Sequence, residues 1–376
     1  MLKFVMLVSF LLSSTSRAFT TTNKLSFHKY TLLTRALSTL QQQQTRTASI
    51  IKRRMTTTRT EMTEEEKYLF DLNGYYVVRG VLTEDEVKEA NAAIDNHIDD
   101  AIERSDAELR NAVPTSPVLY GTGPGRQDLG GVLEWSQNES RVFKSILAHP
   151  KLVPLFHGLM GKGYRMDHLP FVIQQTHGAE GFSLHGGTVD CNSGRYNPHL
   201  AYSCHQGQLH CTLLGCNVML SDHNEGDGGF CVVPGSHKSN FKAPSAMIKG
   251  ESEHYFSSSF VQQPVTKAGD VVLFSEGTVH GAKAWTSTER KRRACLFRFA
   301  PSNVAYGRSY FGHNGDGWPT KMYDNLNDAQ RSVLERPYAN RLDRPNIILN
   351  EEDNHCDKVE ITTRSERKKL HDQQVF

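Results

Sequence analysis

The feature that most constrains the fold is a series of short segments, rich in β-branched and aromatic residues, that begins beyond Gly163. Turns rich in glycine and aspartate, such as those at 225–229 and 268–270, separate these segments. Several short strands joined by such turns are typical of β-sandwiches and β-barrels, so we expect a core of this kind. The predicted strands are Phe171–Gln175, Leu213–Leu220, Phe230–Val233, Val271–Phe274 and Ala294–Phe299.

Helical patterns precede these strands. The predicted elements are a helix at Glu64–Leu72, a strand at Tyr75–Leu82, a helix from Thr83 to about Ile102 and a helix from Ser140 to about Leu147. Thr83 followed by Glu86 has the spacing of a capping box, which marks a helix start. The segment 111–135, rich in Gly and Pro, is expected to form a surface loop. Helices followed by strands predict one α+β domain over residues 61–350.

Composition places this domain among ordinary globular proteins, with 38% hydrophobic and 22% charged residues. The charge is distributed unevenly, because residues 1–60 contain ten Lys or Arg and no Asp or Glu. The rest of the chain carries 33 basic against 41 acidic residues. A mildly acidic domain argues against a nucleic-acid-binding surface, so we expect no nucleic-acid partner.

Residues 1–60 have the character of a targeting presequence. Lys3 precedes the apolar run Phe4–Leu12, which is too short to span a bilayer but has the length of a signal-peptide core. A basic, hydroxylated stretch follows Ala18-Phe19 and ends at Arg54. This arrangement resembles the two-part plastid address of algae with complex plastids; a mitochondrial address and a disordered basic tail are the alternatives.

Other segments indicate neither a membrane span nor a disulfide scaffold. No other run is apolar enough to cross a bilayer, and residues 351–376 form a polar tail. The seven cysteines contain no CxxC pair, which argues against structural zinc and a disulfide framework. The sequence contains no pattern that indicates an oligomeric state.

Two of the 17 histidines stand out by their positions. His280 follows the predicted strand at 271–274 after a short connection, and Gly281 comes directly after it. His185 ends another short run and is followed by Gly186-Gly187, which would let a ligand or metal approach the backbone. Two imidazoles from separate strands can supply two corners of the facial triad that leaves open positions on Fe(II).

Three motifs resemble the phytanoyl-CoA dioxygenase family. They are Asp227–Lys238 (DGGFCVVPGSHK), Gly269–Phe274 followed by His280-Gly281, and Arg292–Phe299. The resemblance covers about 65–345. It implies a double-stranded β-helix (a jelly-roll or cupin-like core) with flanking N-terminal helices. It also implies Fe(II) as cofactor, with 2-oxoglutarate and O2 as co-substrates.

The resemblance assigns roles to individual residues. His185 resembles the proximal iron ligand and His280 the distal one. Arg292 resembles the partner of the distal carboxylate of 2-oxoglutarate, with Arg293 as the alternative, since a guanidinium makes two parallel hydrogen bonds to a carboxylate. Taken without the family, Arg292 could equally be a solvated charge in the basic run 289–293. His237, within the PGSHK segment, is expected to be structural.

The third iron ligand departs from the family pattern of His-x-Asp, because Gly187 stands two residues after His185. Glu276 could supply the carboxylate if a turn brings it towards His280, and Asp190 could do so from a loop. A halide could instead fill the position, as in 2-oxoglutarate halogenases. We favour Glu276 over Asp190. His205, in a His-Gln-Gly segment, is a rival proximal histidine.

The function implied by the resemblance is oxidation of a small organic metabolite, by default hydroxylation. Desaturation, oxidative ring closure as in the algal kainoid synthases, and halogenation are alternatives. Two alternatives belong to other functional classes. One is a catalytically inactive relative that binds a small molecule, and the other is a cupin-like metal protein that does not use 2-oxoglutarate. The substrate is expected to be a small molecule, bound in a pocket shaped by the loops 111–135, 186–204 and 239–262.

Overall fold

The computed structural model describes residues 59–104, 112–191, 193–257, 259–307, 317–338, 344–349 and 356–361. The chain divides into two units, Met1–Thr57 and Thr58–Phe376, and the fold described here is that of the second. The predicted presequence, except its last two residues, lies outside the described residues, and so does the predicted C-terminal tail apart from residues 356–361. Among the helices that the structure describes, none has the length and apolar character needed to cross a bilayer.

Helices dominate the beginning of this unit. The α-helices are α3 (Glu64–Asn73), α4 (Glu84–Asn96), α5 (Gln137–Ser145), α6 (Val153–Met160), α7 (Ser245–Ile248), α8 (His254–Ser257) and α9 (Asp328–Val333). Short 3-10 helices are η1 (Ile98–Asp100), η2 (Ile146–Ala148), η3 (Pro198–Leu200), η4 (Ser236–Lys238) and η5 (Thr320–Tyr323). Thr63 and Thr83 close capping boxes at the starts of α3 and α4, as the sequence predicts for α4. Helix α4 ends at Asn96, earlier than predicted.

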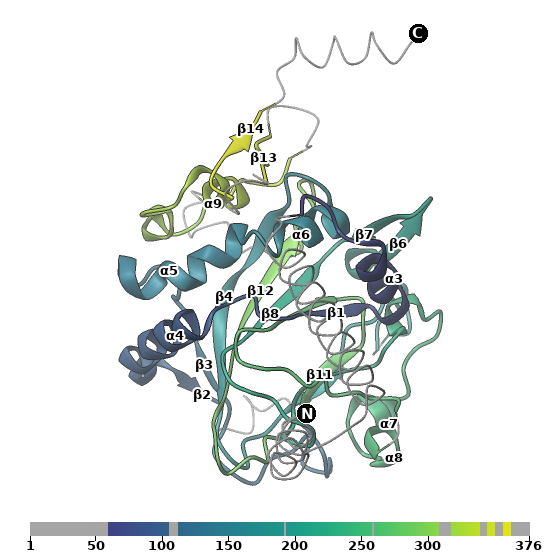
Figure 1. The fold of residues 1–376 in the computed structure, drawn as a ribbon. Coiled ribbons are helices and arrows are strands. Elements are labelled where there is room, and N and C mark those ends of the chain that lie inside the picture. The colour runs from purple at the N-terminus through teal and green to yellow at the C-terminus, as the bar shows by residue number, and fades with distance from the viewer. Residues whose placement is uncertain are drawn as a thin grey trace, which may run out of the picture. The chain divides into compact units, whose positions relative to one another are not determined.

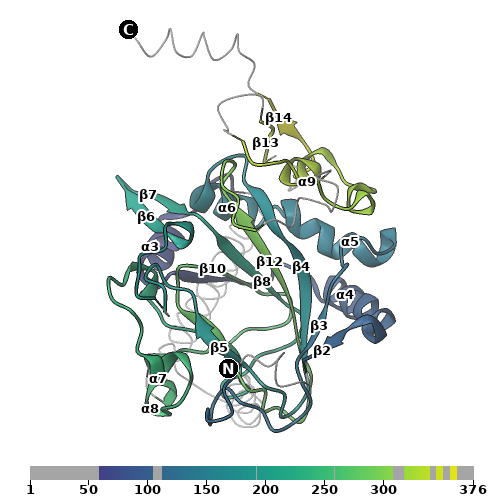
Figure 2. The ribbon, with the colours of Figure 1, turned by 180° about the vertical axis from the view of Figure 1, so that it is seen from behind.

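The strands form two main antiparallel sheets. The strands are β1 (Tyr75–Val78), β2 (Ile102–Glu103), β3 (Gln127–Leu129), β4 (Arg165–Gln175), β5 (Phe182–His185), β6 (Tyr202–His205), β7 (Gln208–Cys211), β8 (Leu214–Met219), β9 (Gly229–Val232), β10 (Val271–Ser275), β11 (His280–Lys283), β12 (Arg292–Ala300), β13 (Asn346–Ile347) and β14 (Val359–Glu360). A seven-stranded sheet has the order β1-β10-β8-β12-β4-β3-β2, and its strands can be followed in Figures 1 and 2. A three-stranded sheet has the order β5-β11-β9. The pairs β6–β7 and β13–β14 stand apart as two-stranded sheets. The mixed helix-and-sheet class expected from the sequence is confirmed.

The two faces of the seven-stranded sheet pack against different partners. Alternate residues of a strand point to opposite faces, so Leu273 packs in the cluster that includes the helices, whereas Phe274 packs with Phe230 of the three-stranded sheet. The rings of Phe230 and Phe274 lie 5.0 Å apart. The space between the two sheets is therefore lined by the inward-facing residues of both.

Two sequence expectations need correction here. The segment 111–135 is not a surface loop throughout, because it contains β3 and buries Leu119, Val132 and Leu133. The predicted strand at Tyr75–Leu82 ends at Val78.

The PGSHK segment contacts the end of helix α3 through His237, which agrees with the structural role expected for this histidine. His237 is buried, and its Nε2 lies 3.1 Å from the carbonyl oxygen of Asp71 near the end of α3. Gly74 has a positive φ of 77°, and a Cβ at this position would lie 2.4 Å from His237 Nδ1. The segment thus fixes the end of α3 against the sheets.

Candidate metal centre

Two histidines and one glutamate meet between the sheets. His185 ends β5 and His280 begins β11, and the two residues are paired directly opposite each other in antiparallel register. Their ring centroids are 4.2 Å apart. Glu276 lies in the turn that joins β10 to β11, and the potential ligand atoms of the three residues all lie within 4.8 Å of one another.

Backbone carbonyl groups orient both imidazoles. Nδ1 of His185 lies 3.0 Å from the carbonyl oxygen of Ser183, and Nδ1 of His280 lies 2.7 Å from that of Thr278. If each Nδ1–H donates to its carbonyl oxygen, each Nε2 keeps a lone pair for a metal. Nε2 of His280 is 3.6 Å from Oε2 of Glu276. The two histidines are thus presented as neutral ligands.

Burial and neighbouring charges set the ionisation of the three groups. Burial lowers the pKa of His185 to about 3 and also lowers that of His280. Burial alone would raise the pKa of Glu276, but Arg298 and the two imidazoles outweigh it and the pKa is lowered to about 2. At neutral pH the centre therefore offers two neutral imidazoles and one carboxylate, which is the ligand set of non-haem Fe(II) oxygenases.

The His-Gly-Gly segment makes room for the turn that carries the glutamate. Gly186 has a φ of +87°, and a Cβ at this position would lie 2.7 Å from the carbonyl oxygens of both Glu276 and Thr278. The turn therefore packs directly against the backbone of Gly186. A side chain here would push the turn away, so the glycine and the position of Glu276 depend on each other.

The other candidates for this centre lie elsewhere. Asp190 is in a turn, where its Oδ1 accepts a hydrogen bond of 2.6 Å from the amide of Ser193, and it is not part of the cluster of three. His205 is exposed at the end of β6, in the separate β6–β7 sheet. The structure thus brings His185, His280 and Glu276 together and leaves Asp190 and His205 apart.

A cavity of about 220 Å³ opens beside the three residues, between the two sheets. Its walls combine apolar side chains with four arginines and one asparagine. The lining includes Phe171, Ile173, Phe182, Phe230, Phe274, Leu296, Arg104, Arg126, Asn217, Arg292 and Arg298, besides His185 and His280. Of the three loops expected to shape the pocket, 111–135 contributes Arg126. The described residues of 186–204 and 239–262 do not line it, so this expectation was wrong for those two loops.

Arg292 and Arg293 point to opposite faces of β12. Arg292 is buried in the cavity wall, where its Nη1 donates to Oε1 of Gln175 and its Nε donates to Nε2 of His223 at 3.2 Å. Burial, together with the charge of Arg126, lowers the pKa of Arg292 to about 10.

Arg293 faces the helices instead. Its Nε donates to Oε1 of Gln174 at 2.6 Å, and its Nη2 donates to Asp95 of α4. Only Arg292 of the two predicted arginines therefore lies at the cavity.

Three further arginines of the cavity, Arg104, Arg126 and Arg298, were missed by the sequence analysis. Nε of Arg104 donates to Oδ2 of Asp128 at 2.5 Å. Arg126 follows the glycine-rich part of 111–135, and it donates to both carboxylate oxygens of Asp128 at 2.8 Å. Arg298 lies on β12 and its Nε donates to Oε1 of Glu276 at 2.6 Å. The alternation of β12 could have identified Arg298, because it is separated from Arg292 by an even number of residues.

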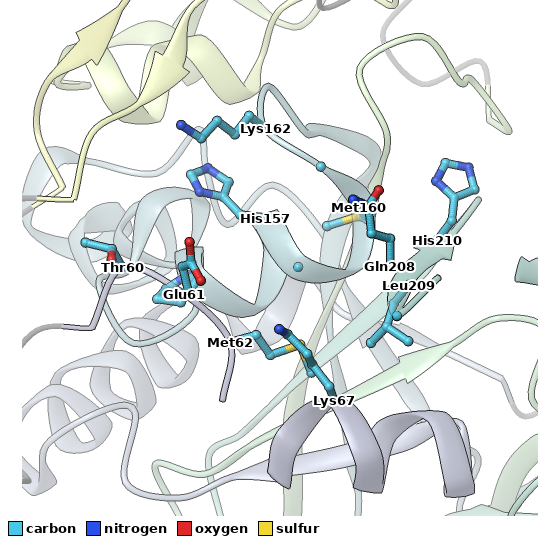
Figure 3. A pocket seen from close by; sticks show the side chains of 14 residues that line it. Thr60, Glu61, Met62, Lys67, His157, Met160, Lys162, Gln208, Leu209 and His210 are labelled. Atoms are coloured by element: carbon cyan, nitrogen blue, oxygen red, sulfur yellow. The ribbon is translucent and has the colours of Figure 1, made fainter. Parts of the chain in front are cut away.

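A second cavity, of about 600 Å³, is larger but holds none of the three clustered residues. It lies between α3, α6 and the β6–β7 turn, and Lys67, His157 and His210 are among its lining residues (Figure 3). Because His185 and His280 line the smaller cavity, we assign the chemistry to that one.

Comparison with known proteins supports this assignment. Residues 70–294, more than half of the chain, match the family model for phytanoyl-CoA dioxygenase (PhyH). A search of curated proteins found no match.

Solved structures of HygX share the fold. HygX from Streptomyces hygroscopicus, with nickel, 2-oxoglutarate and hygromycin B bound, is 22% identical with a TM-score of 0.52, over 65% of this chain and 89% of HygX. HygX with nickel and 2-oxoglutarate bound is also 22% identical with a TM-score of 0.52, over 69% of this chain and 96% of HygX. The epimerase SnoN from nogalamycin biosynthesis is 19% identical with a TM-score of 0.44, over 65% of this chain and 85% of SnoN. The matched family model and the clustered ligand set lead to one conclusion: the chain belongs to the phytanoyl-CoA dioxygenase family and is a 2-oxoglutarate-dependent non-haem iron enzyme.

Proposed function

We propose that this protein oxidises a small organic metabolite, by default through hydroxylation, at an Fe(II) ion held by His185, His280 and Glu276. The observation that carries the proposal is the convergence of these three side chains beside a cavity that also contains Arg292. We further propose that the two facing antiparallel sheets form a double-stranded β-helix. Iron and 2-oxoglutarate, when bound, supply the oxidising chemistry by activating O2 with release of succinate and CO2.

The residues present fit both cofactors. Two neutral imidazoles and a carboxylate suit Fe(II) and leave positions open for other ligands. The buried guanidinium of Arg292 suits the distal carboxylate of 2-oxoglutarate, because Gln175 and His223 hold it in place and a buried cation gains from an anionic partner.

The cavity walls have two tasks in this scheme. Phe171, Ile173 and Leu296 present apolar surface that can hold a substrate carbon and exclude water. The carbonyl groups of Ser183 and Thr278 keep both histidines in the ligand tautomer. These groups position the reactants, and they do not themselves take part in a proton transfer.

Glu276 also bears on the alternatives. A carboxylate beside the two histidines favours an oxygenase over a halogenase, because the position that a halide would need is already supplied with a ligand. The same carboxylate favours an iron enzyme over an inactive binding protein. Desaturation and oxidative ring closure use the same protein groups as hydroxylation and differ in the substrate, so they remain within the proposal.

Conversion of 2-oxoglutarate to succinate tests the proposal without knowledge of the substrate. We expect the unit from Thr58 onward to convert 2-oxoglutarate slowly to succinate in air when Fe(II) is present. Succinate formation is expected to stop when a chelator removes the metal. The measurement is succinate by mass spectrometry. A folded, iron-loaded protein that forms no succinate above the Glu276→Gln variant would contradict the proposal.

We also propose that residues 1–60 direct the protein to a plastid, with the mitochondrion as the alternative. The support is the apolar core followed by an acid-free basic stretch. A fluorescent protein fused after residue 60 and expressed in an alga with complex plastids tests this, and fluorescence confined to the cytosol would overturn both addresses.

A further inference from the structure

The two oxygens of the Glu276 carboxylate have different neighbours, because Arg298 binds one of them. Nε of Arg298 donates to Oε1 at 2.6 Å, whereas Oε2 lies 3.6 Å from Nε2 of His280. Both side chains are largely enclosed, with exposed fractions of 19% for Arg298 and 7% for Glu276. One oxygen is therefore engaged by the guanidinium, and the other faces the histidines.

The two histidines and the glutamate differ in how the fold fixes them. His185 and His280 stand on paired strands, and each ring is tied to a backbone carbonyl through Nδ1. Glu276 stands in a turn, where its backbone amide donates a 3.0 Å hydrogen bond to the carbonyl oxygen of Leu213. A glutamate side chain has several rotatable bonds, so its carboxylate needs an additional partner to stay in one place.

Strand β12 supplies that partner from a rigid position. Arg298 pairs with Gly215 of β8 on one side and with His168 of β4 on the other, near the middle of the seven-stranded sheet. Its side chain points to the same face as that of Arg292 and lines the cavity. The sheet therefore fixes the backbone of Arg298, and the guanidinium, which is enclosed in the cavity wall, can hold a carboxylate that belongs to a turn.

The hydrogen bond from Arg298 affects how many oxygens of Glu276 can bind a metal ion. A free carboxylate can bind a metal ion through both oxygens and so occupy an extra coordination position. A charge-assisted hydrogen bond to Oε1 disfavours this mode and leaves Oε2 as the ligand. More positions on the ion then stay open for 2-oxoglutarate and O2, as the facial triad requires.

We infer that Arg298 is a positioning residue that holds Glu276 as a one-oxygen metal ligand facing His185 and His280. This inference rests on the proposed function, since it takes Glu276 as an iron ligand. It assigns Arg298 to the outer shell of the metal, where loss of a partner costs about 10- to 100-fold in metal affinity.

The test measures metal binding and coordination, not turnover. Arg298→Gln is expected to bind Fe(II) about 10- to 100-fold more weakly than wild type in anaerobic calorimetry. Arg298→Lys keeps a charge and a donor and is expected to lose less. Arg293→Gln is the matched control, because it removes a buried arginine of the same strand that faces the helices. Its Fe(II) affinity is expected to stay at the wild-type value even if its Tm falls.

Two further readouts separate positioning from a general effect on folding. The visible absorption of the Co(II) protein weakens as the coordination number rises. A weaker absorption in Arg298→Gln, but not in Arg293→Gln, would show that Glu276 binds the metal in a different way. In a Glu276→Gln background, Arg298→Gln is expected to cause no further loss of affinity, because its effect passes through Glu276.

The outcomes distinguish this inference from the proposed function. A wild-type protein that binds no Fe(II) would overturn the proposed function and the inference with it. The inference alone would be overturned if wild type binds iron and a folded Arg298→Gln variant has the same Fe(II) affinity and the same Co(II) spectrum as wild type. The inference alone would also fall if Arg298→Gln weakens binding equally with and without Glu276.

Discussion

Replacement of His280 by Ala is expected to weaken Fe(II) binding by at least about 100-fold. Removing a residue that only orients a metal ligand costs up to about 100-fold in metal affinity, and His280 would be a ligand itself. The reason is that His280 stands directly opposite His185 and nearest to Glu276, so its loss leaves two possible ligands of three. Succinate formation is expected to fall to the background of the metal-free protein. Anaerobic calorimetry with Fe(II) measures the first effect, and mass spectrometry measures the second.

His205→Ala is the matched control for this variant. His205 resembles a proximal ligand in sequence but is exposed at the end of β6, away from the cluster of three. We therefore expect its Fe(II) affinity to equal that of wild type. The opposite result, with His205→Ala defective and His280→Ala intact, would show that the metal centre has been placed on the wrong histidine.

Replacement of Arg292 by Leu is expected to weaken 2-oxoglutarate binding to the iron-loaded protein by about 2–5 kcal/mol, or roughly 30-fold to several thousand-fold. The guanidinium is buried in the cavity wall, where water cannot replace it as a partner for a carboxylate. Arg292→Lys keeps the charge but not the two parallel hydrogen bonds, so an intermediate loss is expected. Fe(II) affinity in the absence of 2-oxoglutarate is expected to change little.

Arg293→Leu serves as the control for losing a buried arginine from β12. Arg293 binds Gln174 and Asp95 on the helix-covered face, so its loss is expected to lower the Tm without changing the affinity for 2-oxoglutarate. Equal losses of 2-oxoglutarate affinity in Arg292→Leu and Arg293→Leu would indicate a general effect on the sheet instead of a binding contact.

The parts of the fold that could be predicted from the sequence are those with a local physical cause. The Thr83 capping box marks the start of α4, and each of the six predicted strands overlaps an observed one, because caps and β-branched runs act within a few residues. Helix α6 was not predicted from its apolar run Leu152–Phe156, since a short apolar run is compatible with either a helix or a strand.

The family resemblance favoured Arg292 over Arg293, but the alternation of residues along the strand could not separate the two, for a related reason. Strand β12 is covered on both faces, so apolar residues occupy both alternating positions and the pattern does not show which face is which. Only the observed contacts, with His223 on one side and Asp95 on the other, assign the two arginines.

The third ligand was left open by the sequence because it depends on a turn. Along an extended chain Glu276 would lie about 13 Å from His280, at about 3.3 Å per residue. The turn after β10 brings the two side chains to 3.6 Å, and its path depends on contact with Gly186. Such contacts join distant parts of the chain and leave no local pattern.

The central claim is that His185, His280 and Glu276 form one iron site that accepts 2-oxoglutarate, and anaerobic titration with Fe(II) and 2-oxoglutarate tests it most directly. We expect the weak visible charge-transfer band of a metal-bound 2-oxo acid in wild type and in Asp190→Asn. The band is expected to be lost or strongly weakened in Glu276→Gln, with or without chloride. An unchanged band in Glu276→Gln, or its loss in Asp190→Asn, would contradict the account.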